Sequence, residues 1–223
     1  MRDRGYQLSY LLLGLSCALM IASLFLVFVY VPTEQTMGVV QRIFYFHVPI
    51  AWISFLSFFV LFVASILHLW KKDAKWDIVA YSSAEIGILF TTLVLVTGPI
   101  WARAAWGAWW TWDSRLTTTL VLWLILVAYM LVRTYSNDES RGARFAAVVA
   151  VLGFIDVPIA ALAIVLWRTQ HPGPVIFEGG LAPSMRLTLF VCLGAFTAFY
   201  ALLLTYRISL RKAETDVKKL VQN

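Results

Sequence analysis

Six long apolar segments constrain the fold of this chain more than any other feature of its sequence. A helix needs about 20 consecutive apolar residues to cross the hydrocarbon core of a bilayer. Segments of this kind cover residues 10–31, 49–69, 78–100, 116–132, 145–166 and 187–206. Only 13% of the residues are charged, about half the share found in soluble proteins, so lipid is the expected solvent for most of the chain. We therefore predict an all-α integral membrane protein, with a single membrane domain over residues 1–223 and six transmembrane helices.

Basic residues are divided unequally between the two sets of segments that connect these spans. An even number of spans places both termini on one side of the membrane. The set of connections on the opposite side holds five of the 18 basic residues: Arg42, Arg103, Arg115, Arg168 and Arg186. The remaining 13 lie on the side of the termini, and the positive-inside rule predicts that this side is cytoplasmic. Topology thus accounts for the net charge of +6 without nucleic-acid binding.

Prolines mark the opposite, outer side. Six of the seven prolines lie in or beside the outer connections: Pro32, Pro49, Pro99, Pro172, Pro174 and Pro183. Proline fixes φ and lowers the entropy that a loop loses on folding, so these connections are expected to have defined shapes. We therefore expect the functional site on the outer face.

A tryptophan-rich connection over residues 101–117 is the densest chemical signal. It holds five of the ten tryptophans: Trp101, Trp106, Trp109, Trp110 and Trp112. An interfacial aromatic belt is one interpretation, but a belt distributes its aromatics over many helix ends. A platform that stacks on a large planar ligand is the interpretation that we favour. Asp113 is then expected to stabilise the loop and Arg115 to reach a carboxylate of the ligand.

Two of the three histidines flank this connection from the other outer loops. His47 precedes the second span and His171 lies in the third outer loop, whereas His68 lies at the inner end of the second span. Each outer histidine is either an ordinary hydrogen-bonded residue or one of two axial ligands of a haem iron. Spacing alone leaves both interpretations open, and for His68 we favour the first.

Other classes of site find little support. The sequence contains neither a readable Ser/His/Asp set nor a GxxxxGK[ST] phosphate-binding loop, which argues against a hydrolase or an ATPase. Asp156 lies near the middle of the fifth span, close to Pro158. It either has a function, as intramembrane acids often do, or satisfies backbone groups that Pro158 leaves unpaired.

The tryptophan-rich segment also resembles a known motif. Trp106-Gly-Ala-Trp109-Trp110-Thr-Trp112-Asp113-Ser-Arg115-Leu-Thr117 is similar to the WWD signature of membrane proteins that handle haem in cytochrome c maturation. The six spans, the His47-Val-Pro49 sequence and the histidine of the last outer loop resemble the CcmC family. Larger relatives in this superfamily, CcmF and CcsA, have more spans. The resemblance covers essentially the whole chain.

This resemblance implies a function without catalysis. CcmC-like proteins bind haem b at the periplasmic face of the bacterial inner membrane and deliver it to the haem chaperone CcmE, and they work with CcmA, CcmB and CcmD. By position, His47 and His171 would be the axial ligands. The platform would consist of Trp101, Trp106, Trp109, Trp110 and Trp112. Asp113 and Arg115 would belong to the same site, in contact with a propionate or with the chaperone.

Two alternatives remain at this point. The chain could be a haem-translocating subunit of an ABC-type transporter complex, with Asp156 and Pro158 along the path. It could also be a membrane electron carrier with a bis-histidine haem.

Overall fold

The computed structural model describes residues 2–167, 171 and 179–222, and the regular structure in these residues is helical. The α-helices are α1 (Arg2–Phe25), α2 (Phe44–Lys71), α3 (Ala74–Trp106), α4 (Ser114–Tyr135), α5 (Glu139–Gly153), α6 (Asp156–Leu166) and α7 (Pro183–Gln222). A π-helical turn, η1 (Leu26–Tyr30), follows α1, and a 3₁₀ turn, η2 (Val39–Ile43), precedes α2. Within these described residues, six helical segments are long and apolar enough to cross a membrane. The predicted all-α architecture with six transmembrane helices is therefore confirmed.

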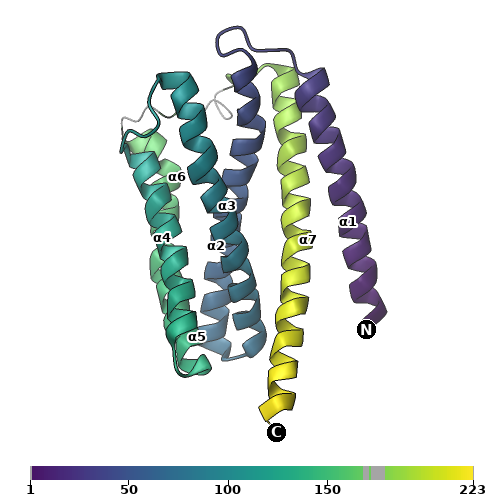
Figure 1. Ribbon diagram of the computed structural model, residues 1–223, viewed down its shortest axis with the longest axis vertical. Helices are drawn as coiled ribbons and strands as arrows, with labels where there is room; N and C mark the ends of the chain where they lie inside the picture. Colours follow the sequence, from purple (N-terminus) through teal and green to yellow (C-terminus); the bar gives the residue numbers. More distant parts are fainter. Residues whose placement is uncertain (1, 168–170, 172–178, 223) are drawn as a thin grey trace.

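The helices form a bundle with α2 and α3 at its centre (Figure 1). Helices α4 to α6 cover one side of this central pair, and α7 with α1 covers the other. Helix α1 begins and α7 ends at the same end of the bundle. The connection between α3 and α4 lies at the opposite end, together with the start of α2.

Hydroxyl groups join the central helices. Ser54 of α2 and Thr91 of α3 are hydrogen-bonded at 2.5 Å, and Ser83 of α3 donates to the Ser57 carbonyl at 2.8 Å. The Tyr200 hydroxyl of α7 lies 2.8 Å from the same Ser83 oxygen. Small residues let transmembrane helices approach closely, and interhelical hydrogen bonds then add to the packing. The central pair is thus a rigid frame for the residues at its ends.

The third span is longer than expected. Helix α3 continues past residue 100 and ends at Trp106, so Trp101, Arg103 and Trp106 lie on a helix and not in a loop. The added segment is rich in alanine, which favours helix. Gly107 ends the helix in the left-handed region with φ of 77°, and its N–H donates to the Arg103 carbonyl.

The fifth span is divided. Helix α5 ends at Gly153 and α6 begins at Asp156. Pro158 lies in the first turn of α6, where its missing N–H is tolerated, whereas a continuous helix would place its ring against the Phe154 carbonyl. The Phe154 ring stacks on Phe62 of α2, with ring centroids 4.0 Å apart and planes 13° apart. Pro158 therefore interrupts the helix of the fifth span, and the stacking of Phe154 on Phe62 stabilises the interruption.

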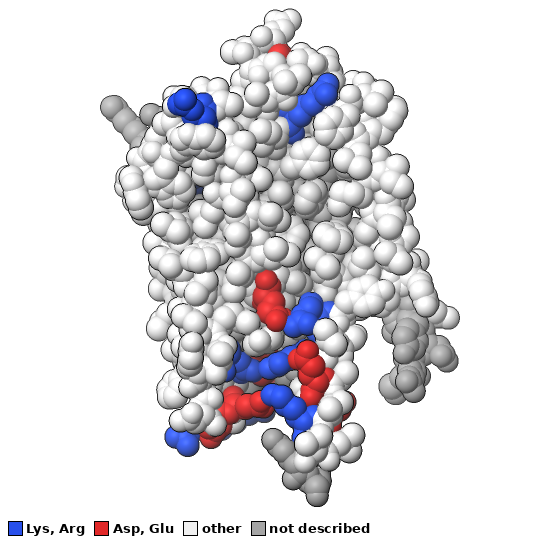
Figure 2. Space-filling view, viewed as in Figure 1, with Lys and Arg blue, Asp and Glu red and all other residues white. Residues whose placement is uncertain are grey.

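Charged residues gather at the end of the bundle where α7 ends (Figure 2). Arg133 of α4 donates two hydrogen bonds to Asp77 of α3, at 2.9 and 3.0 Å. Arg207 of α7 pairs with Glu85 of α3. The charges at this end neutralise one another in ion pairs. Few acidic residues lie at the opposite end among the residues that the structure describes.

Candidate functional site

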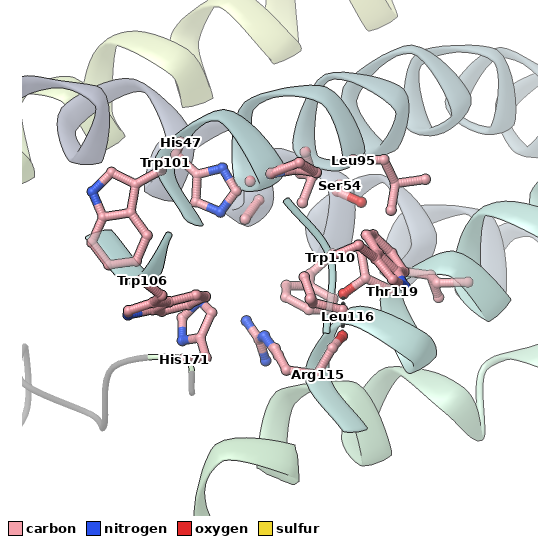
Figure 3. Close-up of a pocket in the computed structure, with 16 residues that line it drawn as sticks. His47, Ser54, Leu95, Trp101, Trp106, Trp110, Arg115, Leu116, Thr119 and His171 are labelled. Atoms are coloured by element: carbon pink, nitrogen blue, oxygen red, sulfur yellow. Dashed lines mark hydrogen bonds between the residues drawn. The ribbon is translucent and has the colours of Figure 1, made fainter. Parts of the chain in front are cut away.

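A cavity lies at the end of the bundle opposite the charged cluster. We call it the histidine cavity; its walls include His47, Trp101, Trp106, Trp110, Arg115 and His171. Figure 3 shows His47 on one side and His171 on the other, with the Arg115 guanidinium pointing toward the space between them. The fold thus brings together residues from α2, the end of α3, the start of α4 and the third outer connection.

His47 is held in one orientation by α3. Its Nδ1 lies 2.8 Å from the Thr97 hydroxyl, and that hydroxyl donates to the Leu93 carbonyl at 2.7 Å. Because the Thr97 hydrogen is directed to Leu93, the Thr97 oxygen accepts the hydrogen of His47 Nδ1. The lone pair of a neutral His47 is then on Nε2, the form in which an imidazole binds a metal.

Thr97 is a site residue that the sequence did not single out. It lies one helical turn before Trp101, and residues four apart share a face of a helix. Neighbouring Gly98 also contributes, because a Cβ at this position would lie 3.4 Å from His47 Cε1. The imidazole therefore packs directly against the α3 backbone.

The five predicted platform tryptophans separate into two groups. Trp101, Trp106 and Trp110 line the histidine cavity. Trp109 and Trp112 lie outside it, with exposed fractions of 59% and 69%. The rings do not form one flat surface, because Trp101 and Trp106 meet edge to face at 5.2 Å and 82°.

Two cavity tryptophans have unused donors. The Nε1 atoms of Trp101 and Trp110 are buried without a hydrogen-bond partner among the residues that the structure describes. A buried polar group without a partner costs about 1–3 kcal/mol. An acceptor on a bound ligand would remove this cost.

Asp113 caps the helix that carries Arg115. Its carboxylate accepts hydrogen bonds from the Leu116 N–H at 3.0 Å and from the Thr111 hydroxyl at 3.2 Å. This is the usual arrangement of an aspartate at a helix N-terminus. It determines where α4 begins, and thereby where Arg115 lies.

Arg115 joins two helices and adds positive charge to the cavity. Its guanidinium donates to the Ala160 carbonyl of α6 and lies 5.5 Å from the centroid of the Phe55 ring. A guanidinium in such apolar surroundings attracts a carboxylate strongly.

The other outer arginines lie elsewhere. Arg103 donates to the Gly107 carbonyl at the end of α3, and the Arg42 guanidinium lies 5.7 Å from the centroid of the Phe28 ring. Arg186 is exposed near the start of α7, and Arg168 lies outside the described residues. Among the outer arginines that the structure describes, Arg115 is therefore the one that lines the histidine cavity.

Comparison with known proteins identifies the family. The family model for Heme exporter protein C, CcmC, matches residues 4–222. The chain belongs to the CcmC family. The Heme exporter protein C of Bradyrhizobium diazoefficiens is 37% identical over 175 residues, which is 77% of this chain and 66% of that protein. The protein of the same name from Escherichia coli K12 is 32% identical over 73% of this chain and 66% of its own length. A ccmC-like mitochondrial protein of Marchantia polymorpha is 30% identical over 92% of this chain and 90% of its own length.

Membership of the CcmC family confirms the resemblance predicted from the tryptophan-rich segment and the six spans. The chain is a multi-pass membrane protein of a haem-exporter family. Its cavity combines imidazole, aromatic and guanidinium groups, the chemistry that iron, a porphyrin ring and a carboxylate would require.

Asp156 lies away from the histidine cavity. It is the first residue of α6, and its Oδ2 is buried without a partner among the described residues. The walls of the histidine cavity do not include it. In the part of the chain that the structure describes, Asp156 therefore makes no contact with the candidate site.

Proposed function

We propose that the chain binds haem b as cargo at the outer face of the membrane and delivers it to the chaperone CcmE, without catalysing a reaction itself. The observation that carries this proposal is the placement of His47 and His171 on two sides of one aromatic cavity. Two neutral imidazoles in that arrangement supply both axial positions of an iron.

The cavity residues fit haem in three respects. His47 has its Nδ1 bound to Thr97, which leaves Nε2 for the iron. Trp101, Trp106 and Trp110 provide apolar surface for the macrocycle. Arg115 supplies a cation for a propionate, and the unused indole N–H groups supply further donors.

Delivery requires a surface that a partner can reach. Trp109 and Trp112 are exposed and belong to the same short connection as Trp110. Aromatic side chains of this kind are frequent at protein interfaces. We propose that these two tryptophans contact CcmE while Trp101, Trp106 and Trp110 hold haem.

The proposed setting is the bacterial inner membrane, with the histidine cavity facing the periplasm. The excess of basic residues on the side of the termini supports this orientation. CcmA, CcmB and CcmD are the proposed partners in the membrane, and an ATPase partner would supply the phosphate-binding loop that this sequence lacks.

The alternative of a translocating subunit gains no support at the inner end. His68 Nδ1 lies 3.4 Å from the Asp73 carbonyl, as expected of an ordinary hydrogen-bonded histidine. His47 and His171 line a cavity near the start of α2, and α2 begins at the other end of the bundle (Figure 1).

Purified protein tests the proposal directly. We expect a Soret band with low-spin bis-histidine features, which His47→Ala and His171→Ala each change by removing one axial ligand. His68→Ala is the matched control and should retain the spectrum. An unchanged haem spectrum in both outer-histidine variants would overturn the ligand assignment.

A further inference from the structure

A large groove adjoins the histidine cavity on the side of the bundle. We call it the lateral groove; it lies between α7 with α1 on one side and α6 on the other, with α2 as its floor. Helix α6 packs against α4, whereas α7 packs against α1, α2 and α3. Among the residues that the structure describes, α6 and α7 therefore leave a space between them at the level of the groove.

The sizes of the two hollows differ greatly. The histidine cavity has a volume of about 40 Å³, room for only a few water molecules. The lateral groove has a volume of about 970 Å³, at the upper end of the roughly 300–1,000 Å³ typical of pockets for small-molecule ligands. A porphyrin held between the histidines must therefore extend into the groove.

The two hollows share their chemically important walls. His47, Trp101, Arg115 and His171 line both of them. A ligand that moves along the groove toward the outer end therefore arrives at the imidazoles and the guanidinium without crossing a helix. Continuity with the histidine pair indicates haem as the occupant of the groove.

The position of the groove along the apolar spans indicates that it faces hydrocarbon. Its wall on α7 runs from Phe190 to Ala201, about 17 Å along the helix axis, within one of the segments that are apolar enough to cross a membrane. The main polar feature of this wall is Thr197, and its hydroxyl accepts a hydrogen bond from Trp52 Nε1 of α2 at 3.1 Å. That bond joins the floor to the wall and leaves an apolar surface for a ligand.

We propose that haem reaches the histidine pair sideways, from the interior of the bilayer, through the lateral groove between α6 and α7. This inference rests on the proposed function. The macrocycle moves with its apolar edge in the groove, and Arg115 at the outer end attracts the propionates. The iron then meets His47 Nε2, which Thr97 orients.

Two glycines provide a matched test. A Cβ added at Gly194 or at Gly14 would meet no atom within 4 Å, so both helices should accept a larger side chain. Gly194 lines the lateral groove, whereas Gly14 is exposed and lies outside its walls. Gly194→Trp therefore obstructs the groove, and Gly14→Trp places the same side chain elsewhere in the same membrane.

The experiment measures haem uptake from lipid. The full chain, freed of haem, is reconstituted into vesicles of phosphatidylcholine and phosphatidylglycerol and mixed with vesicles of the same composition that carry haem. Growth of the bis-histidine Soret band reports uptake. We expect Gly194→Trp to slow uptake by about tenfold or more, with the same final spectrum, and Gly14→Trp to match the unsubstituted chain. Gly194→Leu should slow uptake less, and it serves as the second variant if Gly194→Trp does not fold.

The outcomes are distinguishable. Uptake at the unsubstituted rate in folded Gly194→Trp or Gly194→Leu would overturn the lateral route, and so would equal slowing in Gly14→Trp. Failure of the unsubstituted chain to form any bis-histidine band would instead refute the proposed function.

Discussion

Replacement of Thr97 by valine tests the geometry of the iron site most directly. The substitution exchanges a hydroxyl for a methyl group of similar size, so it removes the 2.8 Å contact with His47 Nδ1 and changes the packing little. The Nδ1 hydrogen then loses its acceptor, and the imidazole is free to rotate or to move its proton to Nε2. Either change opposes binding of iron by Nε2.

Two lines of reasoning give the magnitude. A partly buried donor left without an acceptor costs about 1–3 kcal/mol. Partners that orient a metal-binding histidine typically contribute 10–100-fold in affinity, which corresponds to about 1.4–2.8 kcal/mol. We therefore expect the dissociation constant for haem to rise roughly 10–100-fold in Thr97→Val.

Spectrophotometric titration of the haem-free protein measures this constant. Thr97→Ser retains the hydroxyl and should recover most of the affinity. Thr92→Val is a matched control, because Thr92 lies on the same helix, donates to Ile88 and accepts from Trp123 Nε1 outside the cavity. It should leave haem binding unchanged.

The same variants carry a spectroscopic signature. Loss of the Thr97 contact should alter the low-spin iron signals in electron paramagnetic resonance, because the plane of the His47 ring is no longer held. A merely structural role for Thr97 would lower stability without that change. If Thr97→Val bound haem with the unsubstituted affinity and spectrum, the proposal that Thr97 orients His47 for iron binding would be refuted.

Further substitutions test the division of the tryptophans and the capping of α4. Trp109→Ala combined with Trp112→Ala should preserve the haem spectrum and slow transfer of haem to CcmE, measured as covalent capture of haem by CcmE. Trp106→Ala should instead change the haem spectrum. The reverse pattern would contradict the division of the tryptophans into a haem-binding group and an exposed group. Asp113→Ala removes the cap of α4 and should cost about 0.5–2 kcal/mol of stability, seen as a lower melting temperature, while Asp113→Asn should retain most of it. An equal melting temperature in Asp113→Ala and the unsubstituted chain would argue against the capping role.

Local features of the sequence anticipated much of the architecture. Transfer of each apolar residue into lipid contributes separately, so runs of about 20 residues identify spans without knowledge of the fold. The division of the fifth span was not predicted: residues 145–166 were expected to form one span, whereas the helix breaks before Pro158, where Phe154 stacks on Phe62. The end of α3 was less evident, because tryptophans suggested a loop where alanine and a left-handed Gly107 extend the helix.

The arrangement of side chains in the site was less predictable from the sequence than the architecture. The motif indicated Trp101 to Trp112 as a group, but successive positions of a helix differ by about 100° in direction, and a turn such as that at Trp112, with φ of 53°, redirects the chain. Which tryptophans face inward therefore depends on how α3 and α4 are rotated against α2. No local signal distinguishes Trp110 from Trp109 in this respect.

The sequence by itself determined that the chain crosses a membrane six times, that its basic residues favour one side, and that histidines and tryptophans are concentrated on the other. These properties follow from residues close together in the chain, because hydropathy and charge act locally. The tertiary structure alone decided that Thr97 orients His47, that Arg115 lies in the cavity, and that a groove between α6 and α7 leads to the histidines. Those relations join residues from different helices, and only helix packing determines which of them meet.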